Sequence, residues 1–141
     1  MKVCITGDQK YISKTTIKKT ISQLKAADSE LEIITLGRTG MGLDSEVRKG
    51  ALMFEDVKFG EFNIPGTPRT MYSLLPLSAF DYPFMKTSKR WQNRNIAAAK
   101  YIDYAIVFIT KPSDLDDPEL SHFIEKLQLY KKQYVVYNTN N

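Results

Sequence analysis

Short apolar runs and amphipathic stretches alternate along the chain. The apolar runs have the length of buried strands, and they lie at positions 1–6, 31–36, 104–109 and 134–137. Between them, apolar residues such as Ile17, Ile21 and Leu24 recur every three or four positions, which is the spacing of a helix with one buried face. This alternation is typical of a parallel sheet covered by helices on both faces.

Two further patterns complete the prediction. Residues 56–62 alternate apolar and polar side chains and indicate a more exposed, edge-like strand. Candidate N-caps precede the helical patterns: Ser13, Asp44 or Ser45, Asn93 or Asn95, and Asp117. We therefore predict one domain over residues 1–141, with a Rossmann-like three-layer α/β/α fold and a mainly parallel five-stranded sheet.

A Pro- and aromatic-rich insertion at about 63–89 fits none of these periods. It contains four prolines together with many aromatic and aliphatic side chains. It is too apolar for a disordered linker and too long for an ordinary connection. Three hypotheses stay open for it: a lid over a ligand, a surface for a partner subunit, or packing against the core.

Composition narrows the class of protein. No apolar run is long enough to span a bilayer, and polar residues from Gly7 to Lys10 interrupt the first run before it reaches signal-peptide length. We therefore expect a cytoplasmic protein without a membrane partner. Cys4 and His122 are the single cysteine and histidine, which excludes a Cys/His zinc site. We expect a buried structural thiol at Cys4, a polar helix position at His122, and neither a metal nor a cofactor.

Charge favours an anionic partner only modestly. The net charge is +4 and the sequence pI is about 9.1, which is compatible with nucleic-acid binding. Much of the excess, however, comes from lysines at helical spacing, and solvated helix faces have the same composition.

A glycine-rich turn follows the second predicted strand. Gly37, Gly40 and Gly42 separate that strand from a helix that begins near Asp44. Glycines let the backbone approach a ligand closely, and the N–H groups of a first helical turn attract anions. The spacing matches neither the dinucleotide fingerprint nor the P-loop. A phosphate site and a purely structural turn therefore both stay open.

A second polar cluster lies at residues 86–95. It brings four cations, Trp91 and three amides together just before an Ala-rich helix. Arg94 and Asn95 are candidates to contact a bound phosphate or base. The alternative is a solvated basic turn with an asparagine as helix cap.

Three short motifs, taken in order, carry a family resemblance. Thr6-Gly7-Asp8 ends the first strand, Gly42-Leu43-Asp44 opens the second helix, and Arg94-Asn95 precedes an Ala-rich helix and an apolar strand. With this order and spacing the chain resembles the SLOG superfamily, specifically its small stand-alone YspA-type branch, over most of the domain outside the insertion.

The resemblance implies a Rossmann-like fold that binds a nucleotide or nucleotide-derived ligand at the carboxyl ends of its strands, and it favours a homo-oligomer. The ligand-binding candidates are Gly7, Asp8, Arg38, Gly40, Gly42, Asp44, Arg94 and Asn95. Among them, Arg38 would add charge, and the backbone from Gly40 to Gly42 would contact the ligand if Asp44 caps its helix.

The sequence departs from the family's pattern in two turns. Arg38-Thr39 replaces a doubled glycine, and residues 110–117 replace a Gly-Gly-x-Gly-Thr-like turn. In the catalytic relatives, the lonely-guy phosphoribohydrolases, that second turn holds phosphate and precedes a working glutamate. We therefore favour a binding protein, a sensor or sequestering protein for a nucleotide-like anion.

Two alternatives stay open. A hydrolase of nucleotide N-glycosidic bonds would need a carboxylate near the ribose, for which Asp8, Asp44 and Glu46 are the candidates. A single-stranded nucleic-acid binder would combine cations with a stacking indole, and its candidates are Lys86, Lys89, Arg90, Trp91 and Arg94.

Overall fold

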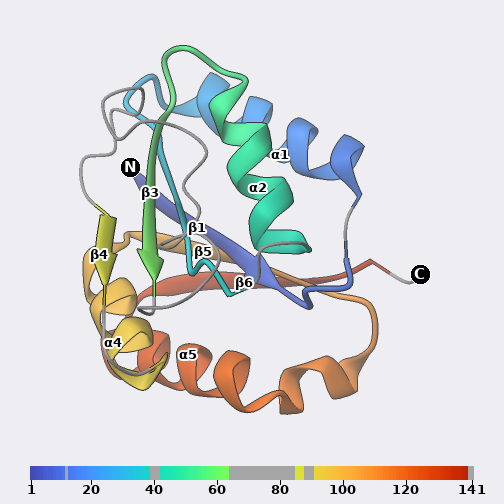
Figure 1. The fold of residues 1–141 in the computed structure, drawn as a ribbon, viewed down its shortest axis with the longest axis vertical. Coiled ribbons are helices and arrows are strands. Elements are labelled where there is room, and N and C mark those ends of the chain that lie inside the picture. Colours follow the sequence, from blue (N-terminus) through green and yellow to red (C-terminus); the bar gives the residue numbers. More distant parts are fainter. Residues whose placement is uncertain (12, 39–41, 64–84, 88–90, 140–141) are drawn as a thin grey trace.

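A computed structural model describes residues 1–11, 13–38, 42–63, 85–87 and 91–139 of the chain (Figure 1). The strands are β1 (Lys2–Gly7), β2 (Glu32–Thr35), β3 (Lys58–Asn63), β4 (Met85–Thr87), β5 (Tyr104–Ile109) and β6 (Gln133–Asn138). The α-helices are α1 (Lys14–Ala27), α2 (Leu43–Leu52), α4 (Trp91–Tyr101) and α5 (Pro118–Leu129), and a short 3-10 helix, η2 (Pro112–Asp116), precedes α5.

The strands form one parallel sheet in the order β4-β3-β2-β1-β5-β6. Helices α1 and α2 cover one face of this sheet, and α4 and α5 cover the other (Figure 1). The predicted Rossmann-like three-layer fold is thereby confirmed. All five predicted strands are present, and β4 adds a short sixth strand from within the segment assigned to the insertion.

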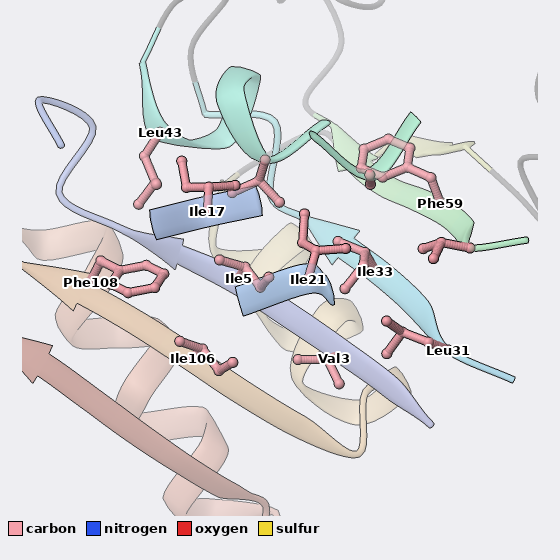
Figure 2. Packing of buried hydrophobic residues seen from close by; sticks show 13 residues of the cluster. Val3, Ile5, Ile17, Ile21, Leu31, Ile33, Leu43, Phe59, Ile106 and Phe108 are labelled. Carbon is pink, nitrogen blue, oxygen red and sulfur yellow. The ribbon is translucent and has the colours of Figure 1, made fainter. Parts of the chain in front are cut away.

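The face beneath α1 and α2 is packed with aliphatic and aromatic side chains. Ile17 and Ile21 of α1 lie over Ile5 and Ile33 of the sheet (Figure 2). Burying each isoleucine side chain stabilises the folded state by about 1.5–3 kcal/mol. Gly50 lets α2 approach α1 closely, since a Cβ there would lie 3.2 Å from the Ile21 Cδ1 atom.

The opposite face packs against α4 and α5. Ala98 and Ala99 of α4 are fully buried beside Ile34 of β2, and their small side chains allow the helix to lie close to the sheet. Cys4 is also fully buried here, and burial raises the pKa of its thiol. The predicted buried thiol is confirmed.

Two expectations about the elements are wrong. The third strand, β3, is not an edge strand: it lies between β2 and β4, and residues 59–62 are buried. Helix α4 begins at Trp91 and not near residue 96, so Asn93 and Asn95 lie inside the helix and neither is its cap.

The predicted caps divide between confirmed and wrong. The side chain of Ser13 accepts a hydrogen bond from the backbone N–H of Thr16, and Asp117 accepts one from Leu120, so both caps are confirmed. Gly42, without a capping side chain, is the N-cap of α2. Neither Asp44 nor Ser45 caps this helix, because both lie within it.

Most of the predicted insertion lies outside the described residues, and its three hypotheses stay predictions. Among the described helices, none has the length and apolar character needed to cross a membrane.

Candidate functional site

The sheet changes its winding direction between β1 and β5. From β1 the chain passes through α1 to β2 on one side, whereas β5 pairs with β1 on the other side. Chain segments that leave the carboxyl ends of these two strands pass to opposite faces of the sheet (Figure 1). Open α/β sheets bind ligands in the crevice that forms at such a point.

A cavity of about 380 Å³ lies at this crevice. Asp8 and Lys10 line it from the loop after β1, Lys111 and Asp114 from the segment after β5, and Arg38 from the segment after β2. Its volume falls within the roughly 300–1,000 Å³ that small-molecule sites occupy. Three segments that are distant in sequence therefore meet around one space.

Asp114 is a fixed acceptor beside this cavity. Its Oδ2 atom accepts hydrogen bonds from the Thr110 hydroxyl at 2.9 Å and from the N–H groups of Thr110 and Lys111 at 2.8 and 3.0 Å. Burial disfavours the charged form, but these hydrogen bonds outweigh it and lower the pKa of Asp114. The Thr110 hydroxyl also lies 3.4 Å from Oδ2 of Asp8, so the two carboxylates share one neighbour.

Arg38 ties three segments together. Its Nη1 donates to the carbonyl of Gly7 at 3.1 Å, its Nη2 to Asp117 Oδ2 at 2.6 Å, and its Nε to Glu119 Oε2 at 3.2 Å. The side chain is 9% exposed. Two carboxylates already neutralise this guanidinium, so it has little charge to offer a ligand. The exposed cations that line the cavity are Lys10 and Lys111.

Asp44 points away from the first turn of its helix. Its Oδ1 accepts from the Thr6 hydroxyl at 3.1 Å and from Gln9 Nε2 at 3.0 Å, and its Oδ2 accepts from the Arg38 N–H at 3.1 Å. The residue is 0% exposed. These partners explain why Asp44 is not a cap, and its burial sets it apart from the cavity.

The start of α2 is already occupied at two of its amides. The N–H of Leu43 donates to the backbone carbonyl of Gln9 at 3.2 Å, and the N–H of Asp44 donates to Gln9 Oε1 at 3.1 Å. These two groups therefore do not face an anion, contrary to the expectation from the glycine turn. Gly42 has a φ of 123°, a conformation that favours glycine, and Gly40 lies outside the described residues.

Arg94 and Asn95 form a buried polar cluster between α4 and α5. Arg94 Nη2 donates to Glu119 Oε1 at 3.0 Å and to Asn95 Oδ1 at 3.2 Å, and Asn95 Nδ2 donates to the Glu119 carbonyl at 2.9 Å. Arg94 is 1% exposed and Asn95 is 0% exposed. Burial lowers the pKa of Arg94, and the carboxylates of Glu119 and Asp44 oppose that shift.

His122 extends this cluster. Its Nδ1 lies 3.3 Å from Asn95 Nδ2, and its ring meets the Trp91 indole edge-on at 5.2 Å. Burial lowers the pKa of His122, and the neighbouring Lys126 charge adds to that shift. A neutral ring with Nδ1 as acceptor fits the amide donor of Asn95.

Apart from Gly40 and Gly42, the predicted site residues divide into two groups. Gly7, Asp8 and Arg38 line the cavity, whereas Asp44, Arg94 and Asn95 are buried in polar contacts around it. The buried residues are connected to Arg38 by two routes. Asp44 accepts a hydrogen bond from the Arg38 N–H, and Glu119 forms ion pairs with both Arg38 and Arg94.

Gly7 has a structural reason to be glycine. Its φ is 148°, and a Cβ at this position would lie 2.0 Å from the carbonyl oxygen of Phe108 in the adjacent strand. The close contact between β1 and β5 therefore excludes any larger residue, whether or not a ligand binds.

Sequence reasoning missed several residues of this region. Lys10, Lys111 and Asp114 line the cavity, and Glu119 joins Arg38 to Arg94. The position of the first three, directly after β1 and β5, was the available signal, because the carboxyl ends of parallel strands meet at one edge. Glu119 had no comparable signal, since an acidic residue is ordinary in a first helical turn.

The residues of the two alternative functions are only partly brought to this region. The Oε1 atom of Glu46 lies 3.7 Å from the Nζ atom of Lys49 on α2, and Glu46 is not among the cavity-lining residues. Of the nucleic-acid candidates, Lys89 and Arg90 fall outside the described residues, and Arg94 is buried. No group of three or more His, Cys, Asp or Glu side chains within the described part of the chain could hold a metal ion.

Comparison with known proteins adds no assignment. No protein-family model matches the chain, and no curated protein matches it either. The geometry of the cavity and the residues around it therefore carry the functional argument.

Proposed function

We propose that the chain binds a nucleotide or nucleotide-derived small anionic ligand in the cavity between the carboxyl ends of β1 and β5. In this proposal it acts as a sensor or sequestering protein. The observation that carries the proposal is the position of a cavity of about 380 Å³ at the point where the sheet reverses its winding.

The mixed charge of the cavity favours a nucleotide over a simple anion. Lys10 and Lys111 are exposed cations that suit a phosphate, whereas Asp8 and Asp114 are carboxylate acceptors. A nucleotide carries both features that this pairing requires, since it joins an anionic phosphate to ribose hydroxyls that donate hydrogen bonds. Inorganic phosphate lacks the ribose, whose hydroxyls would donate to these carboxylates in a bound nucleotide.

The resemblance to the SLOG superfamily supports the same proposal. It implies a ligand at the carboxyl edge of the sheet, and Gly7 and Asp8 of its first motif line this cavity. The Arg94-Asn95 motif supports the site indirectly, because Arg94 shares Glu119 with Arg38.

The binding test is isothermal titration calorimetry with AMP, ADP and inorganic phosphate on the wild type and three variants. Lys111→Ala and Asp8→Asn each remove one charged group from the cavity, and Lys18→Ala is the matched control because Lys18 is an exposed lysine on α1 outside the cavity lining. A hydrogen bond to a charged group contributes about 1.5–3 kcal/mol, so each cavity variant should weaken nucleotide binding about tenfold or more.

The control variant should bind as the wild type does. Binding that Lys18→Ala weakens as much as Lys111→Ala would point to general charge and not to this cavity. No heat with any nucleotide at millimolar concentration would reject the proposal.

An N-glycosidic hydrolase remains a second candidate because a partly exposed carboxylate, Asp8, lines the cavity. Asp44 does not serve this candidate well, since it is 0% exposed and accepts three hydrogen bonds. A time course with nucleoside monophosphates, followed by detection of free base, separates the two functions. Release of base that Asp8→Asn abolishes would replace binding alone with hydrolysis.

A further inference from the structure

The two edges of the sheet differ in length. The edge strand β6 has six residues, and within the described residues it pairs with β5 alone. The opposite edge strand, β4, has three residues. A long edge strand presents a row of backbone N–H and C=O groups to which another chain can pair, whereas a short one presents few.

The edge at β6 lacks the features that usually protect such a strand. Its sequence, Gln-Tyr-Val-Val-Tyr-Asn, contains no charged residue and no proline, and it pairs with β5 residue by residue from end to end. Lys132, just before the strand, has its ammonium bound to the carbonyls of Lys100 and Ile102. Proteins normally protect an open edge with charges, prolines or bulges, so this strand is suited to being covered.

The surface beside this edge carries apolar side chains among polar ones. Tyr137 is 50% exposed although its ring stacks on Phe108 at 5.8 Å. With Tyr104 and Phe108 it lines a groove of about 480 Å³ between β6 and α1, to which α1 adds polar side chains such as Lys19 and Gln23. A partner that pairs with β6 would therefore also cover apolar side chains next to the strand.

We propose that a second copy of this chain covers the edge, through antiparallel pairing of β6 with β6 around a two-fold axis, so that the two sheets become one. A second copy fits because the strand carries no charge, and two identical strands then meet without like-charge repulsion. Such an interface is self-complementary, which is what two-fold symmetry requires.

The backbone direction limits which residues can pair. The N–H of Thr139 donates to the carbonyl of Ile109 at 2.8 Å, so it faces β5. Since backbone groups alternate in direction along a strand, those of Val135 and Tyr137 also face β5, and those of Tyr134 and Val136 face outward.

Among the registers that satisfy this direction, we place the two-fold axis at Val136, near the middle of the six-residue strand. A two-fold axis perpendicular to the sheet keeps both α1 layers on the same side, so paired residues must belong to the same face. Placing Val136 opposite its counterpart lets the outward backbone groups exchange hydrogen bonds. The same register places the exposed Tyr137 opposite Val135 of the second copy, where cross-strand neighbours cover each other.

The first test measures mass by sedimentation equilibrium over a range of protein concentrations. The wild type should sediment as a dimer, and Val136→Pro should sediment as a monomer. Proline at this position removes an outward N–H and leaves the ladder to β5 intact. Leu129→Ser is the matched control, because Leu129 is 61% exposed on α5 and outside the pairing, and it should remain dimeric.

A monomeric wild type at every concentration would overturn the proposal. A dimer that persists in folded Val136→Pro would also overturn it, because the dimer would then use another surface.

The second test checks the register and does not depend on proline. Val136→Cys should form an intermolecular disulfide on mild oxidation, since opposed residues of a hydrogen-bonded pair have Cα atoms about 5.5 Å apart. Val135→Cys is the control, because its counterpart lies on a diagonal at about 7–8 Å. Native Cys4 is fully buried and does not compete. Cross-linking of Val135→Cys alone, or of neither variant, would contradict the register.

Discussion

Two layers of polar side chains meet at the carboxyl edge of the sheet, and they differ in their surroundings. The cavity layer consists of Asp8, Lys10, Lys111 and Asp114; the two lysines are exposed and the two aspartates are partly exposed. The buried layer consists of Asp44, Arg94, Asn95 and Glu119; the first three are at most 1% exposed, and Glu119 is 29% exposed at its side chain.

This difference in exposure indicates which charged residues are available to a ligand. A buried charge must be paired, and removing one partner is costly, so the buried layer holds α2, α4 and α5 in position. The exposed lysines of the cavity layer do not hold helices in position in this way. We therefore expect changes in the buried layer to reduce stability and changes in the cavity layer to reduce binding.

The largest expected effect is that of Arg94→Met. This change leaves Glu119 and Asn95 without their shared buried partner, and breaking a buried ion pair in this way costs about 3–5 kcal/mol. Urea denaturation measures the loss in the free energy of unfolding. Lys100→Met is the matched control on the same helix, because Lys100 is exposed and should change stability by no more than about 0.5 kcal/mol.

Equal stabilities for Arg94→Met and Lys100→Met would mean that the buried layer does not hold α4 to α5.

A smaller loss is expected for Asp44→Asn. The amide retains one acceptor for Thr6 and Gln9, but its NH₂ group then faces the N–H of Arg38, which donates to Oδ2 in the wild type. An unsatisfied buried donor costs about 1–3 kcal/mol. Thermal and urea unfolding measure this cost. A variant as stable as the wild type would show that the carboxylate is not needed at this position.

The smallest effect concerns pH and His122. Because burial lowers its pKa in the folded protein, the folded state binds this proton less readily than the unfolded state does, and protonation favours unfolding. The contribution of neutral His122 to the free energy of unfolding is complete above the pKa of the unfolded state, about 6.5. It is lost as the pH falls through the lower pKa of the folded state.

Urea unfolding at pH 7.5 and pH 5.5 measures this contribution. The free energy of unfolding should decrease toward the lower pH in the wild type and decrease less in His122→Gln. Identical pH dependence in the two proteins would count against a partly buried, neutral histidine.

The fold could be predicted from the sequence because its signals are local. Periodic apolar residues such as Ile17 and Ile21, and caps such as Ser13 and Asp117, fall where the structure has helices. The position of β3 could not be read in this way. Its strand contains Glu61, which looked exposed, yet Glu61 is 1% exposed and accepts a hydrogen bond from the Thr35 hydroxyl at 2.9 Å.

The site could be predicted only in outline. Gly7, Asp8 and Arg38 follow strands, and parallel strands bring such positions to one edge. The burial of Arg94 depends on Glu119, which lies 25 residues further along the chain, and charged residues are seldom fully buried unless they are paired. The orientation of Asp44 depends on Thr6 and Gln9, which no local pattern connects to its helix.

The most direct test of the central claim is an NMR titration of amide chemical shifts with AMP. We expect the amides of residues 7–10 and 110–114 to shift together and saturably, because these residues surround the cavity, while those of β6 stay unchanged. Amide shifts confined to other parts of the chain, or no shifts at millimolar AMP, would contradict nucleotide binding at the crevice between β1 and β5.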